Sequence, residues 1–325
     1  MVEGVTKRTC LDIVIVNWNS SDQLETCLHS IEMAEKRSFV LSRVVIVDNN
    51  STDGSISFTT TFPFPLHVVK NFENKGFGVA CNQGAENSEA DLLLFLNPDV
   101  ELYKDSLEIP MKLFSQKSSQ DIGVLGIQLL NEKGEISKTC ARIPSPGMFL
   151  INTLGIDRIF PMVFKSHLMF DWAHNQTDYV GHVMGAFYLM RRSIFEKLGG
   201  FDSRFFVYLE DLDLSCRLGQ AGYKVLYLEE ARAFHKGCGT SEQVKAKRLF
   251  YAQRSKIRYA IKHFKRWQAL SIILLMVSCE VFIRIAVDLL RFSFKDAGET
   301  IKTYGMLYHE LPSLLKELNN GRIIE

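Results

Sequence analysis

Residues 43–54 read RVVIVDNNSTDG, so a run of branched apolar residues ends abruptly in short polar residues and glycine. Branched apolar runs of this length are typical of buried strands, whereas Asn, Ser, Asp and Gly are typical of turns. The sequence therefore predicts a strand over Arg43–Val47 and a polar loop over Asp48–Ser55 at its carboxyl end.

The same arrangement recurs on either side of this stretch. Further apolar strands are predicted over Leu11–Val16, Leu66–Val69, Asp91–Leu96 and Ile122–Leu130, with helical spacing from Asp22 to Met33 and over Gly76–Asn87. Strands that alternate with helices indicate an α/β fold with a mostly parallel central sheet covered on both faces. Such sheets bind ligands beyond the carboxyl ends of their strands, so the polar residues after the first, second and fourth strands mark the expected site.

The pattern is less regular in the rest of the chain. We expect loop and short helix over Pro144–Tyr179, a long strand over Tyr179–Arg191, a helix over Glu210–Gly219 and a strand over Lys224–Leu228 that leads to His235. After Thr240 the character becomes helical. The prediction is therefore a first domain over residues 1–240 and a C-terminal helical extension over residues 241–325.

The extension combines a basic helical pattern over Ser241–Phe264 with a strongly apolar stretch over Trp267–Phe292. Within that stretch Glu280, Arg284 and Asp288 recur every four residues, so we expect one polar stripe of mutually paired charges. The stretch approaches the length of about 20 residues that spans a bilayer, although three charges disfavour a span. Two interpretations stay open: a helix lying on the membrane, or a helix buried against the domain or a second subunit.

Composition gives weaker guidance. The formal net charge of +1 gives no indication of nucleic acid binding, and the seven cysteines are odd in number with no Cys-x-x-Cys pair. Such cysteines are typical of a reducing compartment, and the polar residues from Met1 to Cys10 lack the apolar segment of a signal peptide. We therefore expect a cytoplasmic protein.

Two acidic motifs suggest chemistry. Asn97-Pro98-Asp99 follows a predicted strand, where a carboxylate can hold a divalent cation against a diphosphate, although a simple turn gives the same residues. Glu210-Asp211-x-Asp213 offers a general base or merely a solvated helix start. The aromatic run before it, Phe205–Leu209, favours a partly buried carboxylate.

Three other segments are weaker alone. Asp48–Gly54 can bond a nucleobase and ribose or serve only as a turn. Asn74-Lys75-Gly76 precedes a helix, where glycine allows close approach and the helix N-terminus attracts phosphate, but the dinucleotide fingerprint is missing. His235 can contact a metal or phosphate, or can be structural.

The order of the motifs is more specific than any one of them. They read Val16-Asn17-Trp18-Asn19, Val47–Gly54, Asn74-Lys75-Gly76-Phe77, Asn97-Pro98-Asp99, Gly185-Ala186-Phe187, Gly199-Gly200-Phe201-Asp202 with Glu210-Asp211, and His235. Over Leu11–Thr240 this order resembles the family 2 inverting glycosyltransferases with the GT-A fold, and among them the bacterial rhamnosyltransferase-type members. The family's metal motif is Asp-x-Asp, so Asn97 departs from it and leaves the metal to Asp99 and the diphosphate.

The resemblance implies a role for each matching position. Asp211 would be the general base with Glu210 beside it, and Asp99 with His235 would bind Mg²⁺ or Mn²⁺. The residues implied to bind the substrates are Asn17, Asn19, Asp48, Asn50, Asp53, Asn74, Lys75, Gly76, Asn82, Asn97, Gly185 and Ala186.

The implied activity is transfer of a sugar from a nucleoside-diphosphate donor, rhamnose from dTDP-rhamnose being one option, to a glycan or lipid-linked acceptor in bacterial cell-surface polysaccharide synthesis. The enzyme would be peripheral on the inner face of the cell membrane, and a homodimer stays open. Two alternatives are a nucleotidyltransferase, disfavoured by the loop Asn17–Ser20, and a catalytically silent glycan- or partner-binding module, disfavoured by the presence of Asp99 and Asp211.

Overall fold

The computed structural model describes residues 8–58, 60–237 and 245–320. The chain forms two compact units. The first contains Met1–Arg142, Trp172–Ser203 and Asp211–Thr240, and the second contains Ile143–Asp171, Arg204–Glu210 and Ser241–Glu325. Two segments that the sequence analysis placed in the first domain thus belong to the second unit, and the expected boundary after Thr240 lies outside the described residues.

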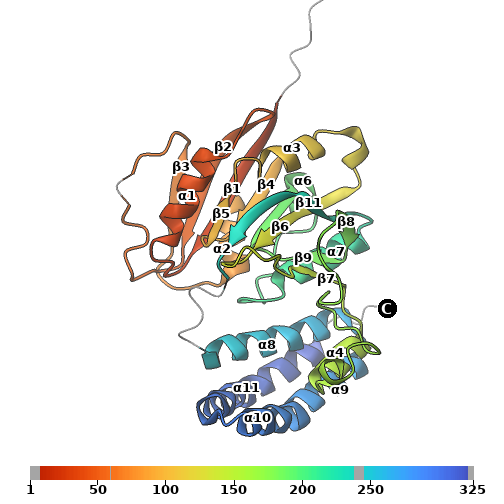
Figure 1. The fold of residues 1–325 in the computed structure, drawn as a ribbon. Helices are drawn as coiled ribbons and strands as arrows, with labels where there is room; N and C mark the ends of the chain where they lie inside the picture. The colour runs from red at the N-terminus through yellow and green to blue at the C-terminus, as the bar shows by residue number, and fades with distance from the viewer. Residues whose placement is uncertain (1–7, 59, 238–244, 321–325) are drawn as a thin grey trace, which may run out of the picture. The chain divides into compact units, whose positions relative to one another are not determined.

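The first unit is built on a nine-stranded sheet in the order β3-β2-β1-β4-β10-β6-β11-β5, with β8 also paired to β11 (Figure 1). Its strands are β1 (Thr9–Asn17), β2 (Phe39–Asp48), β3 (Leu66–Lys70), β4 (Leu92–Leu96), β5 (Val100–Leu102), β6 (Ile122–Leu130), β8 (Asp178–Val180), β10 (Phe187–Arg191) and β11 (Lys224–His235). β1 to β4 are parallel, β10 runs antiparallel between β4 and β6, and β5 and β8 are antiparallel to β11. The sheet is therefore mixed and mostly parallel.

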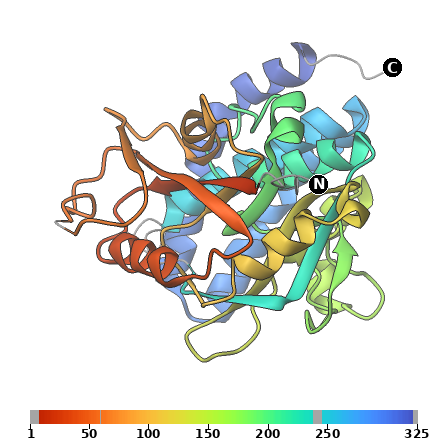
Figure 2. The same ribbon diagram turned by 90° about the horizontal axis from the view of Figure 1, so that it is seen from above.

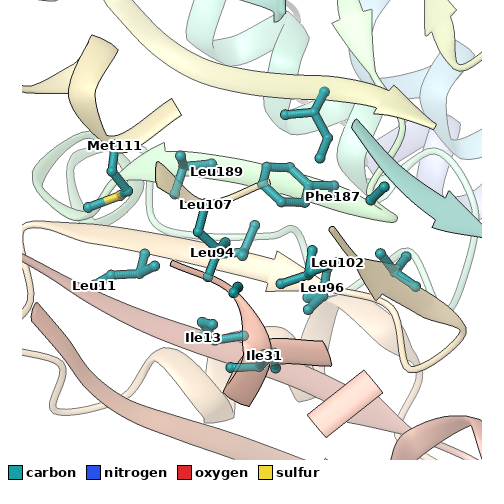
Figure 3. Close-up of a cluster of buried hydrophobic side chains, with 14 of the residues drawn as sticks. Leu11, Ile13, Ile31, Leu94, Leu96, Leu102, Leu107, Met111, Phe187 and Leu189 are labelled. Carbon is teal, nitrogen blue, oxygen red and sulfur yellow. The ribbon is translucent and has the colours of Figure 1, made fainter. Parts of the chain in front are cut away.

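Helices cover both faces of this sheet. One face carries α1 (Gln23–Met33) and α3 (Glu108–Phe114), and the other carries α2 (Phe77–Ala85), α6 (Arg192–Lys197) and α7 (Glu210–Gln220), as Figure 2 shows. Alternate strand residues such as Leu11, Leu94 and Phe187 pack against Ile31 and Met111 on the first face (Figure 3). Because these side chains must stay buried on one face, the strands cannot slip by one residue relative to each other. The positions of their carboxyl ends along the edge of the sheet are therefore fixed.

The strands predicted from apolar runs are confirmed, with one exception. The expected long strand over Tyr179–Arg191 is wrong, because the chain forms β8, then β9 (His182–Val183), then a break at Met184–Ala186, then β10. β9 leaves the main sheet and pairs with β7 (Cys140–Ala141). Continuous apolar character hid this change of partner, which places Gly185 in a non-strand position.

The second unit is helical. It contains α4 (Pro146–Thr153), α5 (Ile156–Ile159), α8 (Lys245–His263), α9 (Arg266–Leu275), a π-helical turn (Met276–Glu280), α10 (Val281–Leu290) and α11 (Phe294–Asn320). The first unit, by contrast, also contains a short 3-10 turn over Lys117–Ser119. α9, the π turn and α10 form one continuous helix over Arg266–Leu290, as the apolar stretch predicted, and α11 continues the helical extension predicted from Thr240 on, although its bounds were not predicted.

The polar stripe of this helix faces its neighbours in the bundle. Arg284 Nη2 lies 2.6 Å from Glu280 Oε1, which also accepts a hydrogen bond of 2.8 Å from Gln253 of α8. Asp288 accepts a bond of 3.0 Å from Thr300 of α11, so the predicted pairing holds for the first two charges and was wrong for the third. The charged side of the helix is therefore the side packed on protein.

Candidate active site

The ends of β1 and β2 are joined by a buried amide. Asn17 and Asp48 are opposite each other at the last position of the two strands, and Asn17 Nδ2 lies 2.8 Å from Asp48 Oδ1. The same nitrogen lies 3.0 Å from Ser51 Oγ and 2.8 Å from Ser55 Oγ. Asn17 is fully buried, so it holds the loop after β2 in place, and the surface that a ligand could meet is the loop itself.

The loops after β1 and β2 brace each other. Asn19 and Asn50 both adopt left-handed backbone conformations, with φ of 50° and 63°, which asparagine tolerates better than most residues. The Asn19 side chain accepts a 2.8 Å bond from the amide of Thr52, and Asp53 accepts a 2.7 Å bond from that of Ser21. A cavity of about 310 Å³ opens beside them, lined by Ser21, Asp22, Glu25, Asp53, Gly54, Ser55, Ser57 and Phe58.

A third loop, before α2, reaches the same edge of the sheet. Gly76 has φ of 86°, and its carbonyl accepts a 3.2 Å bond from the Asn49 side chain. The Asn74 side chain accepts a 2.9 Å bond from the amide of Gly76, which shapes the turn that also carries Lys75. Asn49 is in turn held by Asn71 at 2.9 Å. Asn49 lies in the predicted loop Asp48–Gly54 without having been singled out, whereas Asn71, which directly follows β3, was not predicted at all.

Asn82 lies apart from these loops. Its side chain donates a 2.8 Å bond to the carbonyl of Phe201 and accepts a 2.9 Å bond from the amide of the same residue. An added Cβ on Gly200, whose φ is 69°, would come within 2.6 Å of Asn82 Oδ1. Asn82 therefore holds the Gly200-Phe201 turn, and the substrate contact that the family resemblance implies for it stays a prediction.

Asp99 and His235 converge from neighbouring strands. Asp99 precedes β5 and His235 ends β11, and the pairing of these strands brings Asp99 Oδ2 within 3.4 Å of His235 Nε2. The amide of Gly237 donates a 3.2 Å bond to the same carboxylate oxygen. A cavity of about 120 Å³ lies here, lined by Asp22, Gln23, Thr26, Asp99, Glu101, Phe234 and Lys236.

This pair fits part of a cation site. Within residues 8–58, 60–237 and 245–320, no cluster of three or more His, Cys, Asp or Glu side chains could hold a metal ion. A carboxylate and an imidazole that face each other suit a divalent cation that takes its other ligands from a diphosphate and water. The donor set thus fits a metal that arrives with its substrate.

Asp211 is held from two directions. Its Oδ2 accepts a 2.8 Å bond from the amide of Gly185, its Oδ1 accepts a 2.8 Å bond from the amide of Leu212, and the side chain is 16% exposed. The amide of Asn97 donates a 3.0 Å bond to the carbonyl of Ala186, next to Gly185. The antiparallel β10 therefore connects the carboxyl end of β4, with Asn97 and Asp99, to the carboxylate of Asp211.

The other two acids of the motif differ from Asp211. Asp213 is fully buried and its Oδ2 lies 2.8 Å from Arg217 Nε, while Arg217 also bonds the carbonyls of Leu198 and Gly200. Asp213 is therefore structural. Glu210 is buried at the start of α7 and follows Tyr208 and Leu209, whose φ values of 69° and 65° mark a strained turn. Strain of this kind, about 1–3 kcal/mol per residue, is concentrated at functional sites.

Gly185→Ala is expected to lower kcat by about tenfold or more, because small displacements of a reacting group are costly. A Cβ at this position would lie 3.1 Å from Asp211 Oδ2, so the carboxylate must move. Gly219→Ala, on the helix α7 that carries Asp211, is the matched control, because nothing lies within 4 Å of its added Cβ. Steady-state kinetics with melting curves checks this, and equal rates for the two variants would contradict it.

Known proteins resemble this chain in sequence and fold. The sequence profile of glycosyl transferase family 2 matches residues 12–199, and that of glycosyl transferase family group 2 matches residues 157–298. An N-acetylglucosaminyl-diphospho-decaprenol L-rhamnosyltransferase from Mycobacterium tuberculosis is 28% identical over 280 residues, 80% of this chain and 87% of the relative. An O-antigen chain rhamnosyltransferase from Salmonella anatum is 27% identical over 209 residues, 62% of this chain and 58% of the relative.

A solved structure shows the same fold. A mannosyltransferase from Pyrobaculum calidifontis, solved in complex with GDP-Man and Mn²⁺, superposes with a TM-score of 0.54 at 16% sequence identity. The match covers 96% of this chain and 86% of the mannosyltransferase. The fold is thus GT-A, with a mixed and mostly parallel sheet flanked by helices and a C-terminal helical segment.

Proposed function

Because this chain belongs to glycosyl transferase family 2 and is therefore a glycosyltransferase, we propose that it transfers rhamnose, with inversion, from a nucleoside-diphosphate donor to a lipid-linked acceptor. The observation that carries the proposal is the Asp211 carboxylate, held 2.8 Å from the Gly185 amide beside the end of β4. The rhamnosyltransferase relatives from Mycobacterium tuberculosis and Salmonella anatum support the sugar, and the decaprenol substrate in the name of the first supports the acceptor.

In the proposed reaction Asp211 removes the proton from an acceptor hydroxyl. The freed oxygen attacks the anomeric carbon, the bond from that carbon to the diphosphate breaks, and the nucleoside diphosphate leaves from the opposite face. Asp99 and His235 would hold a divalent cation, Mg²⁺ or Mn²⁺, which neutralises negative charge on the diphosphate when bound. General base catalysis and fixed positioning by the Gly185 amide supply the protein's part of the rate enhancement.

The braced loops after β1 and β2 form the proposed donor pocket. Asn19, Asn50 and Asp53 lie on these loops, and Lys75 lies on the third loop at the same edge. Left-handed residues and side chain-to-backbone bonds fix the loops before the donor arrives, so little ordering is needed on binding. Asn17 and Asp48, which bond each other while Asp48 also accepts from the Ser51 amide, are proposed to support the pocket.

The donor is identified by calorimetry with a panel of nucleoside diphosphates and their sugars, with and without Mg²⁺ or Mn²⁺. We expect metal-dependent binding of dTDP and dTDP-rhamnose, followed by transfer of radiolabelled rhamnose to a polyprenyl-diphosphate-linked N-acetylglucosamine. Binding and transfer with another nucleotide sugar would reassign the donor. A folded protein that bound no nucleotide would contradict the proposal as a whole.

The exposed side of the second unit's apolar helix supports a location at a membrane surface. The helix Arg266–Leu290 has 25 residues, and its most apolar stretch of 18 residues has a mean hydropathy of 2.3 and is 28% buried. Large apolar side chains that remain exposed are Trp267, Leu270, Leu274, Phe282, Ile283, Val287, Leu289 and Leu290. The inward side buries Ala269, Ile272 and Met276 together with the Glu280–Arg284 pair, so the paired charges face the bundle while large apolar side chains face outward. A helix in a water-soluble bundle normally has polar residues on its outward side.

The charges around the helix support a membrane as the partner of this face. Exposed cations stand at both ends of the helix, Lys265 and Arg266 before it and Arg291 and Lys295 after it, where they can reach anionic lipid head groups. The neighbouring helices are too charged for hydrocarbon, since Arg258 of α8 pairs with Glu317 of α11 at 2.9 Å. The helix is thus proposed to lie in the interface with one face in lipid, at the cytoplasmic leaflet where a lipid-linked acceptor is presented.

A double change, Phe282→Glu with Leu290→Glu, is expected to weaken binding to phosphatidylglycerol vesicles by roughly 100-fold, because each side chain stabilises insertion by about 1.5–3 kcal/mol. Met33→Glu is the control, since Met33 is 75% exposed on the first unit. Vesicle flotation measures binding, and light scattering measures the oligomeric state. Unchanged flotation of the double variant would contradict the membrane proposal, and its conversion from dimer to monomer would assign the face to a second subunit.

A further inference from the structure

A chain of buried polar side chains lies behind the Asp211 carboxylate. His182 Nε2 is 3.6 Å from Asp211 Oδ2, and His182 Nδ1 is 3.0 Å from Ser215 Oγ. Ser215 Oγ is in turn 2.9 Å from the hydroxyl of Tyr188. Three different elements contribute these groups, with His182 on β9, Tyr188 on β10 and Ser215 on the same helix as Asp211, α7.

Burial restricts the protonation states of this chain. His182, Ser215 and Tyr188 are at most 7% exposed. Burial lowers the pKa of His182, against the opposing effect of the Asp211 charge, so the imidazole is neutral and carries one proton. Burial also raises the pKa of the Tyr188 phenol, so this hydroxyl remains a donor.

The direction of the hydrogen bonds follows from charge. A neutral imidazole has one N–H and one bare nitrogen, and a bare Nε2 facing the Asp211 carboxylate would place two sets of lone pairs opposite each other. The favourable tautomer has its proton on Nε2, directed at Asp211. Nδ1 then accepts from the Ser215 hydroxyl, and the Ser215 oxygen accepts from Tyr188, so each donor has one acceptor.

We propose that Tyr188, Ser215 and His182 are positioning residues that fix the imidazole as the Nε2–H tautomer, so that its N–H faces the carboxylate of the proposed base, Asp211, at an N···O distance of 3.6 Å. The inference rests on the proposed function, because it assigns a purpose to a group that supports that base. The Gly185 amide bonds Asp211 Oδ2, and the imidazole faces the same oxygen, so the two groups together fix the orientation of the carboxylate. The remaining lone pairs of the Asp211 carboxylate are left for the acceptor hydroxyl. The arrangement follows the general rule that a third group sets the tautomer and orientation of a catalytic pair.

The irregular path of the chain around Gly185 is consistent with this purpose. β9 leaves the main sheet, and its Val183 packs over Gly126 of β6, where an added Cβ would lie 2.6 Å from Val183 Cβ. This packing places His182 beside α7, while the break at Met184–Ala186 turns the Gly185 amide toward the same carboxylate. The amide that bonds Asp211 Oδ2 and the imidazole that faces the same oxygen therefore come from one short segment.

The test uses two substitutions of His182 in the full-length protein. His182→Gln places an amide N–H near the position of Nε2 and is expected to keep kcat within about fivefold, whereas His182→Met removes the donor and should lower kcat by about 10- to 100-fold. The KM for the sugar donor should be unchanged in both variants, because His182 does not belong to the proposed donor pocket. A melting curve for each variant separates loss of fold from loss of rate.

Ser215→Ala tests the tautomer itself. It removes the donor to Nδ1 and should lower kcat by roughly three- to tenfold by allowing the wrong tautomer. In the His182→Gln background the same change should have no further effect, because glutamine has no tautomer to set. An additive loss in that background would overturn the inference, as would equal rates for His182→Gln and His182→Met.

Asp211→Asn distinguishes failure of this inference from failure of the proposed function. If Asp211→Asn abolishes transfer and His182→Met does not lower kcat, the base assignment stands and the positioning role is wrong. If Asp211→Asn retains full kcat, the base assignment itself fails, and the support proposed for it has no purpose.

Discussion

Asp211→Asn is expected to lower kcat by about 10²–10⁴-fold, the contribution of a positioned general base. Asparagine keeps the shape of the side chain and an oxygen that can accept from the Gly185 amide, but it cannot take a proton from the acceptor hydroxyl. The loss should fall on the chemical step. Single-turnover transfer of labelled sugar measures that step, and calorimetry with the donor should show unchanged affinity.

Asp213→Asn is the matched comparison, two residues along the same helix. Asp213 is fully buried and paired with Arg217, so removing its charge leaves a buried cation without its carboxylate. Breaking such a pair costs about 3–5 kcal/mol, so this variant should unfold at a lower temperature. If Asp213→Asn instead melted normally and lost transfer while Asp211→Asn remained active, the roles of the two acids would be reversed.

The sheet was predictable because its signal is local. Leu11–Val16 and Ile122–Leu130 are continuous apolar runs, which is how a strand reads when both its faces are covered. The positions of the polar loops after β1, β2 and β4 followed from the rule for parallel sheets. Asp99 was proposed in this way, whereas Asp211 was proposed from the acidic cluster Glu210-Asp211-x-Asp213 and from the order of motifs that the family shares.

The partners within the site were not predictable, because they depend on contacts between distant residues. Asn82 bonds Phe201, 119 positions along the chain, and no local pattern indicates that its amide is occupied. His182 gave no signal, because it lies in an apolar run that resembles one long strand. Its place beside Asp211 depends on β9 pairing with β7, which alternation of apolar residues cannot show.

The apolar helix shows the same limit. Its length and the spacing of Glu280 and Arg284 were visible in the sequence, but periodicity does not tell which face packs on protein. The structure supplies that information through Gln253 of α8, which bonds Glu280 at 2.8 Å. The inward-facing charge pair and the exposed apolar side chains are the observations on which the proposed membrane location rests.

Asp99→Ala is expected to abolish the metal dependence of donor binding and to lower kcat/KM by more than about 100-fold. Asp99 is the carboxylate in the pair with His235, and Asn97 supplies a neutral group where the family has a second acid. A divalent cation usually needs at least one protein carboxylate to remain beside a diphosphate, and this chain offers Asp99. Loss of the cation leaves the charge on the leaving diphosphate uncompensated.

Calorimetry with the nucleoside diphosphate, with and without Mn²⁺, checks this directly. In the unaltered protein, chelation of the metal should weaken nucleotide binding, whereas in Asp99→Ala binding should be weak with or without it. His235→Gln should show a smaller loss, because it keeps the carboxylate that carries the charge. If the chelator left nucleotide binding and transfer unchanged in the unaltered protein, Asp99 would be acting without a metal. The diphosphate charge would then have to be met by cationic side chains such as Lys236, which lines the same cavity.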